Sequence, residues 1–161
     1  MTRLRYLQIL FFFLILQACD PEMVYDHFVT MDNGMWTWSD VGEFQIPVSD
    51  TVSLHNIYIQ VRHSVDYPMS NLYMFVVLKG PSGQFARDTV DLQLAAPDGR
   101  WFGKGIGRLR ELRLLYRKQV RFSEPGTYTI YLEQAMRKQA LPVRDVGIRV
   151  ERVNPGKSGK G

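Results

Sequence analysis

The chain has a single cysteine, Cys19, among its 161 residues. One cysteine excludes an internal disulfide and a thiolate metal cluster, so packing alone must hold the fold together. Histidine is also scarce, with only His27, His55 and His63 in the whole sequence. After residue 20 there is no long hydrophobic run and no convincing helix-length amphipathic pattern, which disfavours a helical protein.

A strong excess of charge of one sign is absent as well. The formal net charge is +4, and acidic and basic residues are interspersed. The first 18 residues hold two arginines and no acid, so without them the net charge falls to +2. So weak a field does not predict a nucleic-acid partner.

The one long apolar run lies at the start of the chain. Arg3 and Arg5 precede an almost unbroken hydrophobic stretch at residues 7–16. A basic region followed by so short a run is typical of a secretory signal and is too short to span a bilayer comfortably. Ala18 directly precedes Cys19, and Leu16 lies three residues before it, a pattern that resembles the bacterial lipobox. The resemblance implies that Cys19 becomes the mature N-terminus, with S-diacylglycerol and N-acyl groups. The alternative is an ordinary signal peptide whose cysteine is accidental.

Cleavage after Ala18 leaves 143 of the 161 residues, about one domain. We therefore expect a cleaved lipoprotein signal peptide at residues 1–18 and a folded domain at residues 41–153. The polar, proline-containing opening predicts a lipidated N-terminus and short tether at residues 19–40. The last residues, 154–161, are mostly glycine, lysine and serine, and this composition predicts a disordered tail.

The mature chain is dominated by period-two alternation. Apolar residues occupy every second position in three clear segments: Phe44, Ile46 and Val48; Ile57, Ile59 and Val61; Val146, Ile148 and Val150. Residues 72–78 form a continuous apolar run, as expected for a strand covered on both faces. Turn signals separate the segments, among them Pro81-Ser82-Gly83 and Pro97-Asp98-Gly99. The pattern predicts an all-β antiparallel β-sandwich, immunoglobulin-like or jelly-roll-like, of about seven to eight strands.

Three segments are harder to interpret. Residues 108–121 contain leucines at helical spacing among several arginines, so they could form a basic helix against anionic phospholipid. We favour a solvated strand and loop, because the helical periodicity is short and has no cap. Residues 133–138 predict one helical turn. Trp36 and Trp38 would share one face of an extended chain, where we expect both to be buried in the core.

No constellation predicts an enzyme. His63, Ser64 and Asp66 are close in sequence, but the nucleophile elbow of a serine hydrolase is absent around them. If the protein were a hydrolase, its activity should be lost when His63 is changed. Asp50, Asp88 and Asp91 are candidates for paired carboxylates. We predict no catalytic residue and no metal site. Trp101 and Phe102 lie in a glycine-rich loop and form a candidate binding loop, for instance a platform on which a sugar stacks.

Several short motifs together resemble a known family, the GldH gliding-motility lipoproteins of the Bacteroidota. The likeness extends over about residues 41–153, in addition to the lipobox, and the motifs are the following: Asp66-Tyr67-Pro68, Ser70-Asn71-Leu72-Tyr73, Asp88-Thr89, the glycine-rich segment 99–107, Gly126-Thr127-Tyr128, residues 133–137 and residues 145–149.

The resemblance implies a lipoprotein of the gliding apparatus, linked to type IX secretion. It implies a non-enzymatic structural or assembly component, anchored to the periplasmic face of the inner or the outer membrane through lipid on Cys19. Other gliding or secretion proteins of the envelope would be its partners, and the covalent lipid would be its only non-protein group. Among functional positions only Cys19 carries over. A surface glycan-binding lipoprotein module is the alternative function.

Overall fold

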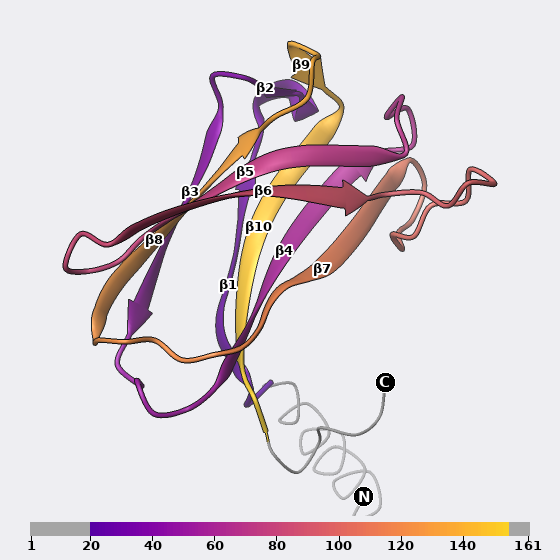
Figure 1. Cartoon of the computed structure of the whole chain (residues 1–161). Helices are drawn as coiled ribbons and strands as arrows, with labels where there is room; N and C mark the ends of the chain where they lie inside the picture. The colour runs from indigo at the N-terminus through magenta and orange to yellow at the C-terminus, as the bar shows by residue number, and fades with distance from the viewer. Residues whose placement is uncertain (1–19, 155–161) are drawn as a thin grey trace, which may run out of the picture.

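The structure is a computed structural model that describes residues 20–154. Within that range it contains ten β-strands and one short 3-10 helix, connected by turns and loops (Figure 1). None of the helices in this range is long and apolar enough to cross a membrane. The elements run in the order β1 (Met23–Thr30), η2 (Asp32–Gly34), β2 (Trp36–Thr37), β3 (Val41–Val48), β4 (His55–Ser64), β5 (Asn71–Lys79), β6 (Phe85–Gln93), β7 (Leu109–Val120), β8 (Gly126–Gln134), β9 (Ala140–Leu141) and β10 (Val143–Arg152).

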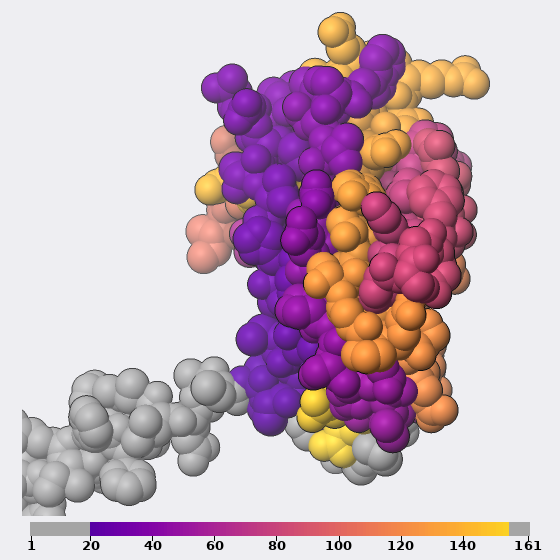
Figure 2. All heavy atoms as spheres, turned by 90° about the vertical axis from the view of Figure 1, so that its left-hand side faces the viewer, coloured from indigo at the N-terminus to yellow at the C-terminus, as the bar shows by residue number. Residues whose placement is uncertain are grey.

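The strands form two four-stranded sheets and one small ribbon. The first sheet has the order β1-β10-β4-β7, the second has the order β3-β8-β5-β6, and β2 pairs with β9. Every pairing is antiparallel. The predicted all-β antiparallel sandwich is therefore confirmed. β1 lies near β3 on one side of the sandwich, where the N-terminal segment runs along the length of the body (Figure 2).

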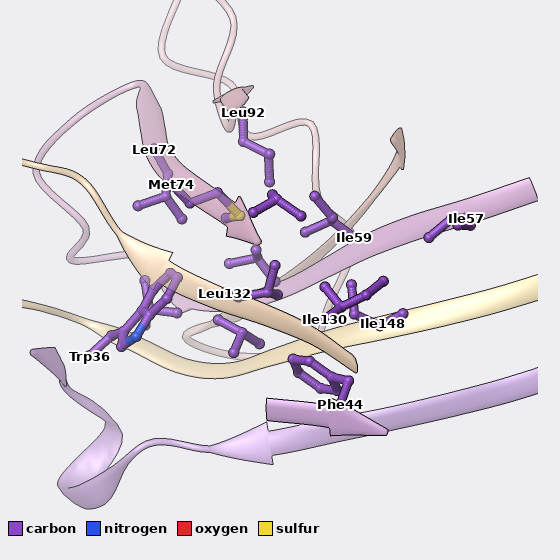
Figure 3. Close-up of a cluster of buried hydrophobic side chains, with 14 of the residues drawn as sticks. Trp36, Phe44, Ile57, Ile59, Leu72, Met74, Leu92, Ile130, Leu132 and Ile148 are labelled. Carbon is purple, nitrogen blue, oxygen red and sulfur yellow. The ribbon is translucent and has the colours of Figure 1, made fainter. Parts of the chain in front are cut away.

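The core lies between the two sheets and follows the alternation in the sequence. Phe44, Ile46 and Ile59 are fully buried, and so are Val146 and Ile148. Side chains from both sheets interdigitate in this layer (Figure 3). Each fully buried aliphatic side chain contributes roughly 1.5–3 kcal/mol relative to an exposed one. That is why a chain without a disulfide can hold this fold.

Strand register defines two ends of the sandwich. Arg152 pairs with His55, and His55 pairs with Val120, so the end of β10, the start of β4 and the end of β7 lie together. Met23 at the start of β1 pairs with Glu151 at the same end. We call this the anchor end, because the described chain begins there. The opposite, distal end carries the connections at residues 31–40, 65–70, 94–108 and 135–139.

The expected tether at residues 19–40 differs from the structure for most of its length. Met23–Thr30 is an edge strand of the first sheet and pairs with β10 along seven residue positions. The sequence concealed this strand because its residues are mostly exposed or half-buried and show no clean alternation. Apolar side chains such as Tyr25 and Val29 still pack against the core. The folded body therefore starts almost twenty residues earlier than the alternation suggested.

Two of the ambiguous segments are now settled. The arginine-rich stretch forms the long edge strand β7, as we favoured, and not a helix. Gln119 near its end has a φ of 54° and interrupts the regular pairing with β4. The predicted helical turn at residues 133–138 is wrong. Glu133 and Gln134 still belong to β8, and the chain then bends while the Gln134 amide donates to the Lys138 carbonyl oxygen at 2.8 Å.

The two tryptophans do not share a face. Trp36 is fully buried, and its indole nitrogen donates to the Asp40 carbonyl oxygen at 2.9 Å. Trp38 is 57% exposed at the distal end. The extended geometry needed for a common face ends at Thr37, because the Asp40 carboxylate accepts hydrogen bonds from the Thr37 amide and hydroxyl and turns the chain. The prediction of burial was right for Trp36 and wrong for Trp38.

Candidate functional site

The predicted lipidation site, Cys19, lies outside the described residues, but the residue that follows it is described. The carboxylate of Asp20 forms an ion pair with the guanidinium of Arg149 in β10. The backbone nearby is fixed as well, because the Arg152 amide donates to the Glu22 carbonyl oxygen at 2.7 Å. The chain is therefore bound to the first sheet from the first described residue onward.

Arg149 is the centre of a charge network on the outer face of the first sheet. Its side chain is only 9% exposed, and it donates to Asp26 at 2.6 Å and to Glu151 at 2.5 Å. Burial by itself would lower the pKa of Arg149. Hydrogen bonds to the carboxylates of Glu151 and Asp26 outweigh that effect and raise its pKa above the usual value. A second layer supports the network, since the Gln60 amide donates to Asp26 at 2.7 Å.

The sheet brings this network together from distant parts of the chain. Asp26 lies on β1 directly opposite Arg149 on β10, and Tyr58 on β4 lies opposite Arg149 on the other side. Residues that alternate with the inward-facing Ile148 and Val150 point outward, so Arg149 and Glu151 share the outer face. We refer to Asp20, Asp26, Gln60, Arg149 and Glu151 as the clamp, because together they fix the start of the described chain to the sheet.

The candidate binding loop lies at the distal end, and its two aromatic residues have different environments. The Trp101 ring packs against the core, with its centroid 4.6 Å from the ring of His63. Phe102 is 48% exposed, and its amide donates to the Leu94 carbonyl oxygen at 2.9 Å. Farther along the loop, Lys104 pairs with Glu111 of β7 through two backbone hydrogen bonds. Trp101 thus fixes the loop to the body, and Phe102 is the aromatic side chain that it presents to solvent.

The residues considered for a hydrolase do not form a triad. His63 is fully buried beneath the loop, and its Nδ1 contacts the Ser64 carbonyl oxygen at 2.9 Å. Burial lowers the pKa of His63, which keeps the imidazole neutral. The Ser64 hydroxyl instead donates to Asp66, and Asp66 pairs with Arg108. Because adjacent residues of a strand point to opposite faces, His63 cannot activate Ser64 here.

The candidate carboxylates are not paired either. Asp50 accepts hydrogen bonds from the amides of Val52 and Ser53 in its own turn at the anchor end. Asp88 accepts from Tyr116, and Asp91 accepts from Asn71. Asp88 and Asp91 are three residues apart on β6 and therefore point to opposite faces. Within residues 20–154 no group of three or more His, Cys, Asp or Glu side chains is arranged to hold a metal ion.

An all-β body whose first described residues are bound to the sheet, behind a segment that resembles a lipobox, is what is expected of a lipoprotein. The sequence profile described as GldH lipoprotein matches residues 23–150, so this chain belongs to the GldH lipoprotein family. It is 31% identical over 151 residues to the gliding motility lipoprotein GldH homolog of Christiangramia forsetii, covering 89% of this chain and 92% of that protein. It is 32% identical over 146 residues to the gliding motility lipoprotein GldH of Flavobacterium johnsoniae, covering 86% and 90%.

One solved structure shows a distant likeness, a chain from the structure of infectious bursal disease virus Gx strain. The TM-score is 0.33 at 11% identity, and the match covers 88% of this chain but only 36% of that chain. So low a score carries no argument about fold or function. The resemblance inferred from the short motifs is thus confirmed by the family match and by the two gliding lipoproteins.

Sequence reasoning identified the family but missed the clamp. Its hydrogen bonds join residues up to 129 positions apart, and only the pairing of β1 with β10 brings them together. The one available signal was the position of Arg149, between the inward-facing Ile148 and Val150 of the last strand. A guanidinium that becomes buried on the outer face of a sheet needs a partner, and the sequence does not say which carboxylate provides it.

Proposed function

We propose that this protein is a non-enzymatic component of the gliding-motility machinery of the cell envelope, linked to type IX secretion and anchored to a membrane through lipid on Cys19. The observation that carries the proposal is the ion pair between Asp20 and Arg149. It means that the residue next to the anchor is already part of the folded body. The membership of the family and the names of its two relatives support the link to gliding.

The anchor would supply affinity and the clamp would supply geometry. Several acyl chains, at roughly 0.8 kcal/mol per buried CH₂, make release from the bilayer negligible. Confinement to a membrane raises the effective concentration of the protein for partners in the same membrane, so weak contacts suffice. Because the clamp leaves almost no slack after Cys19, the anchor end would face the lipid surface and the distal end would face the envelope.

We propose that partner proteins of the gliding or secretion machinery dock at the distal end. Large apolar side chains are exposed there, among them Trp38, Phe102 and Ile106. Exposed aromatic residues are the usual anchors of protein interfaces. Trp101 would act indirectly by holding the loop. The buried side of its ring is unavailable for stacking on a sugar, which favours a protein partner over the glycan-binding alternative.

The proposal is tested by changing Cys19. We expect Cys19→Ala to remain an unprocessed precursor or to appear in the soluble fraction, because the lipid has no attachment point. The wild-type protein should resist extraction by high salt and carbonate, and its intact mass should include the acyl groups. Val52→Ala is the matched control, since it keeps the thiol and changes a side chain that is 78% exposed. A processed, unacylated wild-type protein would refute lipid anchoring.

The distal surface is tested separately in cells. Photo-crosslinking from position 102 should capture an envelope protein, whereas crosslinking from Thr129, on the outer face of the second sheet, should not. Phe102→Ser should abolish the capture without lowering the melting temperature, because half of the side chain is solvent-exposed. Equal capture from both positions would remove the loop from the proposal and leave lipid anchoring untouched.

A further inference from the structure

The sandwich has an apolar cleft on the side where its edge strands β6 and β7 face each other. The cleft has a volume of about 290 Å³. Its floor is formed by Ile57, Val76 and Ile130, which belong to the core, and Leu78 and Phe122 lie along its walls. On the opposite side of the molecule β1 and β3 lie close together. The cleft therefore leaves core side chains accessible from solvent along the edge of the sandwich formed by β6 and β7.

A polar bridge closes the cleft partway along the strands. Asp88 on β6 accepts a hydrogen bond from the hydroxyl of Tyr116 on β7 at 2.5 Å and pairs with the neighbouring Arg117. Burial, followed by the hydrogen bond to Asp88, raises the pKa of Tyr116 to about 12, so the hydroxyl keeps its proton at neutral pH. Because this bridge crosses between the sheets, an additional β-strand cannot lie along the full length of the opening. The space suits a thin, flexible ligand.

The mouth of the cleft combines apolar and cationic groups. Phe85 is 69% exposed at the rim, and Ala86 is also exposed there. Arg121 lines the cleft and forms no ion pair with any residue between 20 and 154. Arg117, by contrast, is already paired with Asp88. An apolar slot with one unpaired guanidinium at its mouth is complementary to an alkyl chain that carries a negative head group.

The cleft also lies toward the anchor end. Val120, in its lining, pairs with His55, which lies opposite Arg152 at the end of β10. The adjacent turn is tied to the same end, because the hydroxyl of Ser82 donates to Glu124 at 2.6 Å. A ligand that enters from the membrane surface would therefore meet the cleft before it met the distal loops.

We propose that this cleft binds one acyl chain of an anionic phospholipid from the membrane that holds the anchor, with the lipid head group at Arg121. The proposal rests on the proposed anchoring at Cys19 for access to the bilayer. The cleft would offer the acyl chain an apolar environment comparable to that of the leaflet it leaves, so the chain would not have to enter water. The guanidinium of Arg121 would favour a lipid with an anionic head group. The bound lipid would hold the body against the membrane at a second point.

The test uses the full lipidated protein in vesicles of phosphatidylethanolamine and phosphatidylglycerol. A trace of phosphatidylglycerol with a photoreactive group on its acyl chain is included, and the labelled residues are mapped by mass spectrometry after illumination. We expect labelling at Phe85, Leu78 and Phe122. Photoreactive phosphatidylethanolamine should label these residues several times less, because its head group has no net charge.

Two pairs of variants test the site. Ala86→Trp should fill the mouth and remove most labelling of the cleft, because the indole ring occupies the space through which the acyl chain would enter. Its matched control, Thr89→Trp, places the same ring on the outer face of the same strand and should label like the wild type. Arg121→Gln should reduce labelling by the anionic probe about fivefold, whereas Lys118→Gln, which lies outside the cleft, should not.

The outcomes separate this proposal from the anchoring proposal. A protein that does not float with the vesicles contradicts lipid anchoring. A protein that floats but is not labelled in the cleft overturns the lipid-binding cleft and leaves the anchor intact. Equal labelling of Ala86→Trp and Thr89→Trp would also overturn the lipid-binding cleft. If either tryptophan variant unfolds, the comparison of Arg121→Gln with Lys118→Gln tests the cleft instead. Labelling by both lipids to the same extent would refute the role of Arg121.

Discussion

Replacing Arg149 with methionine tests the clamp most directly. The substitution keeps an unbranched side chain of similar length but removes the cation that Asp26 and Glu151 share. The two carboxylates would remain on the outer face of the first sheet, where their side chains are only 25% and 19% exposed. Each would lose a charge-assisted hydrogen bond, and the two negative charges would repel each other.

The magnitude follows from burial. Removing one partner of a fully buried ion pair costs about 3–5 kcal/mol. Asp26 and Glu151 keep some water, and Gln60 still donates to Asp26, so we take the lower end of that range. The expected loss is about 3 kcal/mol in the free energy of unfolding, which for a domain of this size lowers the melting temperature by about 10 °C. Urea unfolding followed by tryptophan fluorescence measures the free energy.

Arg152→Met is the matched control. Arg152 lies three residues along the same strand, but its side chain is 51% exposed and 3.4 Å from Asp50. An exposed pair of this kind contributes little, so this variant should unfold at the wild-type urea concentration within error. If Arg149→Met and Arg152→Met unfold at the same concentration of urea, the clamp does not stabilise the fold and the reasoning fails.

Two further predictions concern the distal loop and the buried histidines. Burial lowers the pKa values of His63 and His55 below their usual 6.5, so both imidazoles stay neutral in the folded protein. The unfolded chain takes up protons at these residues below pH 6.5, and the free energy of unfolding should therefore fall as the pH drops below that value. The melting temperature of His63→Leu, measured across this range, should depend less on pH than that of the wild type, and parallel curves would contradict the assignment. Gly105→Ala should detach the loop from β7, because the new Cβ would lie 2.1 Å from the Leu109 carbonyl oxygen. Limited proteolysis of this variant should then cut within residues 103–108. The control Gly107→Asn should stay resistant, because Gly107 lies in open space at a φ of 63° that asparagine tolerates. Equal resistance of both variants would show that the close contact of Gly105 with the Leu109 carbonyl does not hold the loop.

The core and most strands could be predicted because inward and outward positions alternate in the sequence. Ile57, Ile59 and Val61 on β4 and Val146, Ile148 and Val150 on β10 follow this rule and are buried. The edge strand β1 escaped, because an edge strand needs only enough apolar contact to cover one side of its neighbour. Its main stabilisation is the backbone pairing with β10, which the side chains do not reveal.

The errors have local physical causes. Trp38 lost its predicted burial because Asp40 turns the chain after Thr37, an interaction between close neighbours that the alternating pattern ignores. The prediction of a helical turn at residues 133–138 failed although Gln134 has a good intrinsic preference for helices. Gln134 stays in β8, where its side-chain amide donates a hydrogen bond to the Lys138 carbonyl oxygen. The clamp and the cleft depend on which strands become neighbours, and alternation within a strand contains no information about its neighbours.

The pairing of β1 with β10 has a mechanical consequence. A pull between Cys19 and the distal loops would run along β1, perpendicular to the backbone hydrogen bonds that join it to β10. In this shear geometry the tension is shared by all of those bonds at once and does not peel them apart one by one. The pairing of β1 with β10 would thus resist a pull along the strand better than a pull away from the sheet.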